Sequence, residues 1–150
     1  MANTIEISDE QKILSVDKSQ LRRTVEHVLR DMKVSKWSVS LAILEDAGIE
    51  RLKEAYFGRR EVTDVISFDF REGKEGKLEC EIVVNTECAV RVAGERSGDP
   101  HAELNLYVVH GLLHQLGYND QELRDSQIMH EKEDELLDEL GFGKVFGGTG

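Results

Sequence analysis

The segment Pro100–Leu116 is apolar on almost every side when it is read as a helix. Asp99 can cap its start, Pro100 suits the first helical position, and Gly117 can end it. A surface helix carries a polar stripe, and this segment has almost none, so we expect it to run buried through the centre of the domain. This burial constrains the fold strongly, because other elements must surround the helix.

The rest of the chain contains segments that can surround such a helix. Strands are predicted where side chains alternate or are β-branched and aromatic, at Thr4–Ser8, Trp37–Leu44, Thr63–Phe70 and Leu78–Val84. The last two strands are expected to pair across the polar turn Arg71–Lys77. Helices are predicted from apolar spacing at Lys18–Met32, from Asp46 to Gly58, from Asn85 to Ala93, and at Leu123–Leu140. This order predicts an α/β or α+β fold with one small sheet packed against helices.

Length and composition indicate one domain and a cellular location. The chain has 150 residues, the size of a single domain, so we expect one domain over residues 1–140 and a glycine-rich flexible tail over residues 141–150. No apolar stretch approaches the roughly 20 residues of a membrane span, and Met1–Ile7 lacks a secretory signal. A cytoplasmic protein without membrane contact is expected. Cys80 and Cys88 lack metal-type spacing and are expected to stay reduced.

The net charge of −11 argues against a protein that coats nucleic acid with a broad basic face. A local RNA-binding cleft remains compatible with it, because the acidity is uneven. Residues 119–139 contain nine acidic and two basic residues, whereas Lys18–Lys33 contains five basic and two acidic residues. We therefore expect a polarised molecule, with a basic face on one side and an exposed acidic helix that turns away from it.

Two histidines, His110 and His114, interrupt the apolar central helix. Positions i and i+4 share one face of a helix about 5–6 Å apart, so both imidazoles can reach one ion. Gly117 then allows the chain to double back and bring Asp120 towards them. Two imidazoles and one carboxylate suit Zn²⁺ and leave a position for water, as in catalytic zinc sites. The alternative is two ordinary core histidines, which would leave two buried polar rings to satisfy separately.

Gly111 distinguishes this pattern from zinc peptidases with the same histidine spacing. In those enzymes the residue after the first histidine is Glu, the general base that activates the metal's water. Glycine cannot serve as that base, so peptidase chemistry is disfavoured. Nothing else in the sequence indicates a general base, and the metal's own water is the simplest nucleophile.

At this motif the chain resembles the YbeY endoribonucleases, which are also described as rRNA maturation factors. The stretch His110–Asp120, HGLLHQLGYND, is similar to the family signature H-G-x-L-H-L-x-G-Y-D-H. Thr63–Phe68, TDVISF, resembles a second signature, T-D-V-L-S-F. Met129 and the acidic stretch Glu131–Glu135 resemble a methionine and acidic residues in the family's last helix. The similarity extends over roughly Ile5–Leu140.

The resemblance implies a single domain with a four-stranded, mostly parallel mixed sheet and a buried central helix that carries the metal. It implies one Zn²⁺ per chain, held by His110, His114 and Asp120, and zinc-dependent cleavage of single-stranded RNA. It also implies roles in maturing the 3′ end of small-subunit rRNA and in ribosome quality control, with the small ribosomal subunit and its associated proteins as partners.

The chain departs from the family pattern at three places. Asp120 stands where the family usually has a third histidine, and a carboxylate oxygen is also an accepted zinc ligand. Phe57 stands where the family has a basic residue that is expected to face substrate. Cys80-Glu81 replaces a Gly-Asp pair. Arg59 matches a following basic position of the family, and Arg60 is a further candidate.

Arg59 and Arg60 are the candidate phosphate ligands, because a guanidinium grips phosphate bidentately. Arg59 and His114 are the candidate catalytic residues. Arg59 is a candidate because a phosphodiester transition state needs a cation beyond the metal. The alternative is two solvated arginines at the end of a helix.

Other side chains are candidates for supporting roles. Ser67 could contact substrate, although a strand serine that faces inward without such a role is commoner. Asp64 is expected to bond backbone amides at the start of a strand, and the alternative is that it faces the cleft. Met129 is expected to pack beneath the ligands. Glu103 and Tyr107 share the helical stripe of the two histidines and could support them. The remaining histidines, His27, His101 and His130, are expected at the surface or at helix caps.

Three functions from different classes are compatible with the sequence. The leading hypothesis is a metal-dependent endoribonuclease. The second is a metal-dependent hydrolase of another substrate, such as a peptide. The third is a ribosome-associated binding factor whose metal is structural.

Overall fold

The four predicted strands form one sheet in the order β1-β2-β4-β3. The computed structural model describes residues 3–71 and 77–145, so most of the predicted turn Arg71–Lys77 lies outside the described residues. Strands β1, β2 and β4 are parallel, and β3 pairs antiparallel with β4. The strands are β1 Thr4–Asp9, β2 Lys36–Leu44, β3 Val65–Asp69 and β4 Lys77–Asn85. The expected α+β fold with a mostly parallel mixed sheet is confirmed.

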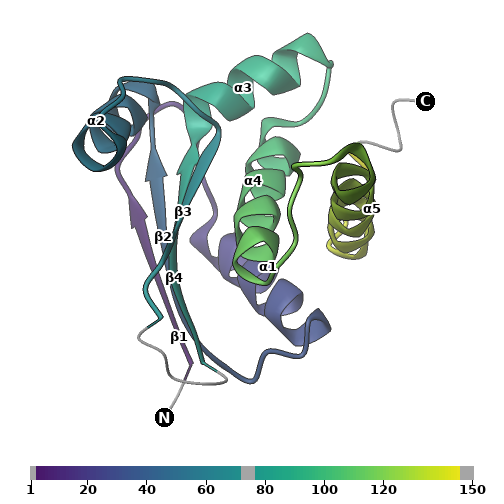
Figure 1. The fold of residues 1–150 in the computed structure, drawn as a ribbon. Coiled ribbons are helices and arrows are strands. Elements are labelled where there is room, and N and C mark those ends of the chain that lie inside the picture. The colour runs from purple at the N-terminus through teal and green to yellow at the C-terminus, as the bar shows by residue number, and fades with distance from the viewer. Residues whose placement is uncertain (1–2, 72–76, 146–150) are drawn as a thin grey trace.

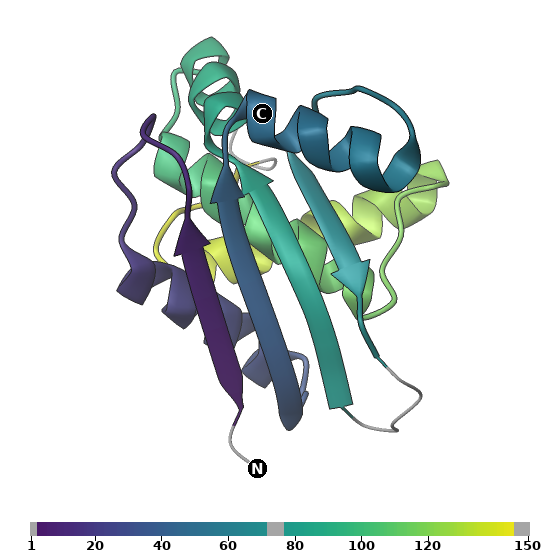
Figure 2. The ribbon, with the colours of Figure 1, turned by 90° about the vertical axis from the view of Figure 1, so that its left-hand side faces the viewer.

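Helices cover both faces of this sheet, but unequally. Helices α1 and α4 lie on one face, and α5 packs outside α4 (Figure 1). Helix α2 lies on the opposite face, nearest the viewer in Figure 2, where Ile49 joins a small second core with Ile66 and Val83. The helices are α1 Lys18–Asp31, α2 Asp46–Phe57, α3 Thr86–Glu95, α4 Pro100–Gln115 and α5 Leu123–Glu139.

Helix α4 is buried on all sides, as its sequence predicts. It contacts α1, α3, α5, β3 and β4, and Asp99 caps it by accepting a hydrogen bond from the His101 amide at 2.9 Å. Its one buried amide side chain, among the described residues, is satisfied by α1. Asn105 accepts from Thr24 Oγ1 at 2.6 Å and donates to Gln20 Oε1 at 2.9 Å. These bonds fix how α4 lies against α1, because leaving a buried amide unpaired would be costly.

Strand β3 starts at Val65, later than the predicted Thr63. The backbone carbonyls of Thr63 and Asp64 bond to Asn85 and not to a continued β3–β4 ladder. Asn85 Nδ2 donates to the Thr63 carbonyl at 3.1 Å, and the Asn85 amide donates to the Asp64 carbonyl at 3.0 Å. A pattern of β-branched residues could not reveal this competing partner, because it lies at the far end of β4.

The acidic last helix is exposed on one face, as expected, and buried on the other. Helix α5 packs against α4, and Lys132 Nζ lies 2.7 Å from the Asp31 carboxylate, which joins α5 to α1. Ile128 on the same helix is exposed. The buried face of the helix includes two acids, and its buried residues are Met129, Glu133, Asp134, Leu136 and Leu137. The apolar spacing of Met129, Leu136 and Leu137 indicates this face, but it does not show which partners make the two buried acids tolerable there.

The described part of the predicted tail contacts the core. Phe142 and Val145 pack against the main core cluster, while residues 146–150 lie outside the described residues. The division of the chain at residue 140 stays a prediction. Both cysteines are free thiols. None of the described helices is long and apolar enough to cross a membrane.

Helix α4 approaches the sheet most closely at Gly111. A Cβ atom there would lie 2.9 Å from Ile82 Cγ2 and 3.3 Å from Val65 Cγ2. Ile82 is fully buried and β-branched, so its methyl group cannot swing aside. Only glycine therefore allows this distance between α4 and β4.

We expect Gly111→Ala to lower the free energy of unfolding by about 1–3 kcal/mol, because the added methyl group overpacks the core. This loss exceeds the roughly 0.5–1 kcal/mol by which alanine is favoured over glycine inside a helix. Urea unfolding followed by circular dichroism measures the difference. Gly94→Ala in α3 is the matched control, since no atom lies within 4 Å of its Cβ position, and it should stabilise the protein. A more stable Gly111→Ala protein would show that the close approach is absent.

Candidate metal centre

His110 and His114 point their Nε2 atoms at each other from the last turns of α4. These two atoms are 3.0 Å apart. The rings stand edge to face, with centroids 4.5 Å apart and an angle of 79° between their planes. Both side chains are partly exposed. The helix therefore presents two imidazole nitrogens to one point at the border of the core.

The chain turns back after α4 and brings Asp120 to the same point. Gly117, with φ of +103°, adopts the left-handed conformation that the turn needs. Asp120 Oδ2 then lies 3.9 Å from His110 Nε2, and Oδ1 lies 3.9 Å from His114 Nε2. One ligand atom from each of the three residues falls within 4.8 Å of the others. The structure thus brings together the three residues that the spacing singled out, and this group could hold a metal ion.

A buried carboxylate on α5 holds His110 in this orientation. Glu133 is fully buried, and its Oε2 lies 2.6 Å from His110 Nδ1. Its other oxygen, Oε1, lies 2.9 Å from His130 Nδ1. A carboxylate on Nδ1 fixes the tautomer of a histidine and leaves Nε2 as the metal-binding atom. Glu133 therefore makes His110 a better metal ligand.

The charges around His110 favour a cation at this point. Burial on its own would lower the pKa of His110, but the hydrogen bond to Glu133 raises it. The negative charges of Glu133, Asp64 and Asp120 act in the same direction, so the pKa lies above its ordinary value. The same field that stabilises a proton on the ring stabilises a metal cation bound to it. The donor atoms and the electrostatics both fit a metal site.

Sequence reasoning missed the roles of Glu133 and His130. His130 was expected at the surface or at a cap, and Glu133 was only part of an acidic stretch. A signal was present, because Glu133 lies one helical turn after Met129 and one before Leu136, on the apolar stripe of α5. An acid on such a stripe needs a buried partner, but the sequence does not say which one.

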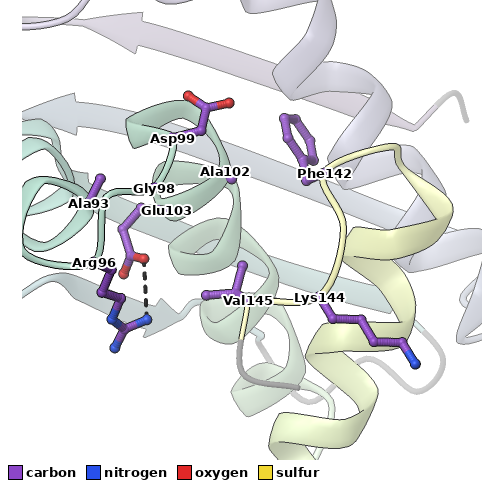
Figure 3. A pocket seen from close by; sticks show the side chains of 9 residues that line it. All are labelled: Ala93, Arg96, Gly98, Asp99, Ala102, Glu103, Phe142, Lys144 and Val145. Carbon is purple, nitrogen blue, oxygen red and sulfur yellow. Dashed lines mark ion pairs between the residues drawn. The ribbon is translucent and has the colours of Figure 1, made fainter. Parts of the chain in front are cut away.

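Glu103 and Tyr107, the two residues that could have supported the histidines from the same helical stripe, have other partners. Glu103 lines a cavity of about 200 Å³ between the start of α4 and the segment after α5, and it pairs with Arg96 at 3.7 Å (Figure 3). Tyr107 donates a hydrogen bond to Cys88 Sγ at 3.5 Å. Both side chains share the helical stripe of the histidines, but the packing of α3 beside α4 turns them to other partners.

Arg59 and Arg60 follow α2, and their side chains are largely exposed. Arg59 Nε lies 3.2 Å from Glu61 Oε1, and Arg60 Nε lies 3.2 Å from Glu50 Oε2. The structure thus pairs the candidate phosphate ligands with nearby glutamates and not with the ligand group. Their assignment to substrate stays a prediction.

The other candidate residues have clear local partners. Ser67 Oγ accepts a hydrogen bond from Gln115 Nε2 at 3.1 Å, which links β3 to the end of α4. Asp64 Oδ1 accepts from the Val65 amide at 2.8 Å, at the start of β3. Met129 is fully buried in the main core. Substrate contact by Ser67 and support of the ligands by Met129 stay predictions.

Gly111 also shows why a peptidase base has no place here. Its Cβ direction points at Ile82 and Val65, into the sheet. A glutamate at this position would meet the side chains of Ile82 on β4 and Val65 on β3. The α4–sheet contact therefore excludes the residue on which that peptidase mechanism depends.

The family model described as Endoribonuclease YbeY matches residues 6–141 of this chain. The chain belongs to the YbeY family. An Endoribonuclease YbeY from Syntrophus aciditrophicus (strain SB) is 35% identical over 144 residues, which cover 91% of this chain and 89% of the relative. Another, from Protochlamydia amoebophila (strain UWE25), is 36% identical over 131 residues, which cover 86% of this chain and 87% of that relative.

A solved structure shows the same fold. The solution structure of TM1509 from Thermotoga maritima matches with a TM-score of 0.65 and 26% sequence identity, covering 91% of this chain and 89% of the other. The resemblance to the YbeY family, inferred from the sequence motifs, is confirmed. The YbeY relatives are named as endoribonucleases, which are hydrolases, so this chain belongs to a family of enzymes.

We expect Glu133→Gln to weaken binding of Zn²⁺ by about 10- to 100-fold, the usual cost of losing a group that orients a metal ligand. The amide keeps the shape of the side chain but loses the charge and one of its two acceptor oxygens. Competition with a chromophoric chelator measures the affinity, and circular dichroism checks the fold.

Glu131→Gln is the matched control, because Glu131 is an exposed acid on the same helix. Equal zinc affinity in the Glu133→Gln and Glu131→Gln proteins would show that Glu133 has no part in holding the ligand.

Proposed function

We propose that this chain is a zinc-dependent endoribonuclease that cleaves single-stranded RNA during rRNA maturation. The observation that carries the proposal is the group of His110, His114 and Asp120, whose ligand atoms lie within 4.8 Å of one another in a YbeY-family chain. The relatives named as endoribonucleases support RNA as the substrate.

Zinc is the ion that the donor set fits best. Two imidazole nitrogens and one carboxylate oxygen match the three-ligand sites in which zinc keeps one position open. When bound in such a site, zinc polarises a phosphoryl oxygen and lowers the pKa of water. Asp120 brings one negative charge to the site where a third histidine would bring none.

The protein's own residues are proposed to orient the ligands and the substrate. Glu133 holds the His110 ring so that Nε2 faces the ligand group. Arg59 and Arg60 are the proposed partners of the RNA phosphates, and Ser67 is proposed to contact the strand. At the reacting phosphate, Arg59 would act directly, whereas His114 would act as a ligand of the metal ion. The ion pairs that now engage the arginines are exposed, and such pairs contribute about 0–1 kcal/mol, so phosphates can displace the glutamates.

Family membership also suggests where the protein acts in the cell and on which RNA. We place the chain in the cytoplasm, where it would act with the small ribosomal subunit and its proteins. Its proposed tasks there are maturation of the 3′ end of small-subunit rRNA and ribosome quality control. These tasks rest on the resemblance to the family.

We expect zinc-loaded protein to cleave a single-stranded RNA oligonucleotide, and a chelator to abolish the activity. His114→Ala and Asp120→Ala should lower kcat/KM by at least about a hundredfold, because each removes a ligand of the ion. Elemental analysis should find about one equivalent of zinc per chain.

His101→Ala is the control, since His101 lies at the other end of α4 and its side chain is not part of the ligand group. Cleavage that persists unchanged in His114→Ala would point to a contaminating nuclease. Zinc-loaded protein that leaves RNA intact but hydrolyses peptides would favour the second function class.

A further inference from the structure

Four aromatic rings gather on the sheet face that carries α2. We call Tyr56, Phe57, Phe68 and Phe70 the aromatic platform. Tyr56 and Phe57 lie at the end of α2. Phe68 lies in the edge strand β3, and Phe70 directly follows that strand. Tyr56 is 68% exposed, Phe57 48% and Phe70 55%. Large aromatic side chains usually contribute to cores and interfaces, so three exposed rings in one cluster indicate a binding surface.

The rings of the platform contact one another through Phe68. Phe68 lies at the centre, with its ring centroid 5.2 Å from that of Tyr56, 6.1 Å from Phe57 and 6.2 Å from Phe70. The planes of Phe57 and Phe70 lie within 13° and 8° of that of Phe68. Phe68 in turn packs against the small core that contains Ile66. The platform is therefore a connected group of rings that Phe68 joins to the core.

The platform and the ligand group lie on opposite faces of the same edge strand. Side chains alternate along β3, so Ile66 and Phe68 face the α2 side, while Val65 and Ser67 face α4. Ser67 is hydrogen-bonded to Gln115, the residue after His114. Figure 2 shows β3 at the free edge of the sheet, with α2 on the near side and α4 behind. A chain that crosses this edge passes from the platform to the metal centre.

Cations accompany the platform along this route. Lys53 Nζ lies 5.5 Å from the centroid of the Phe57 ring. Arg71 follows Phe70, and its Nη2 donates to the carbonyl of Gln115 at 3.1 Å, next to His114. Its guanidinium also pairs with Asp69 at 2.9 Å, and both side chains are exposed, so a phosphate can compete for it. Flat apolar faces beside positive charges complement a single-stranded nucleic acid, which offers stacked bases and phosphates. An apolar protein surface would match the rings but not the cations.

We infer that the aromatic platform stacks the bases of the single-stranded RNA that flanks the cleaved phosphate. The inference rests on the proposed function and adds a second contact surface to it. Stacking on aromatic rings contributes about 1–3 kcal/mol per base and tolerates any base, because every base has a flat face. A duplex keeps its bases stacked inside the helix and cannot use the platform. The platform therefore selects single strands without reading their sequence.

The first test compares Phe57→Leu and Phe70→Leu with wild type in cleavage of a single-stranded oligonucleotide. Leucine keeps the apolar bulk and removes the flat ring. Each change should raise KM about five- to tenfold, the lower part of the range for one lost stacking contact, and leave kcat nearly unchanged. Phe57→Tyr should retain the wild-type KM. Ile13→Ala is the control, because Ile13 is an exposed apolar residue in another part of the chain.

The second test separates bases from phosphates. Binding is measured by fluorescence anisotropy in a His114→Ala background, which prevents cleavage. This protein should bind an oligonucleotide about 25- to 100-fold more tightly than an abasic strand of the same length, since the abasic strand has the same charge but nothing to stack on the two rings. Adding Phe57→Leu should lower this preference about five- to tenfold and leave the salt dependence of binding unchanged, because the phosphate contacts remain.

The outcomes distinguish the platform from the proposed function. If wild type cleaves RNA and the leucine variants keep its KM and its preference for bases, the platform is overturned and the proposed function stands. If zinc-loaded wild type neither binds nor cleaves RNA, the proposed function fails and the platform fails with it. If sedimentation shows a dimer that the leucine variants dissociate without any change in RNA binding, the surface joins two copies of the chain and the inference is wrong.

Discussion

The buried carboxylate of Glu133 joins the core to the candidate metal centre. A charge taken out of water is tolerated only when it is paired and hydrogen-bonded, and Glu133 finds its partners in His110 of α4 and His130 of its own helix. The contact between α4 and α5 must therefore form in the one register that brings these groups together. The packing of the last helix and the orientation of a metal ligand are consequences of the same interaction.

The burial of α4 determines where the site can lie. The helix is enclosed by the sheet, α1, α3 and α5, and Gly111 sets its distance from β4. The side chains of His110 and His114 lie near the C-terminal end of the helix and are partly exposed. A rigid, enclosed helix thus holds two ligands in place, while the turn at Gly117 supplies the third from a more accessible loop.

An acidic protein that acts on RNA needs contacts other than a broad positive field. Part of the acidity of the last helix is internal, because Glu133 and Asp134 are buried. On the other side of the molecule, the aromatic platform offers stacking beside a few cations. Stacking does not depend on net charge, so it suits a chain whose net charge is −11. Such a surface also accounts for aromatic residues that the core does not bury.

The sequence by itself determined the features that repeat within one element. Three such features are local: the apolar side chains on all sides of α4, the histidines at positions i and i+4, and the turn at Gly117. Helix and turn geometry alone place these residues as the sequence predicts. Only the tertiary structure decided which acid supports His110, which face of α5 is buried, and that rings from α2 and β3 meet. These features join residues far apart in the chain, and a buried charge or an exposed ring has no meaning until packing supplies its partner.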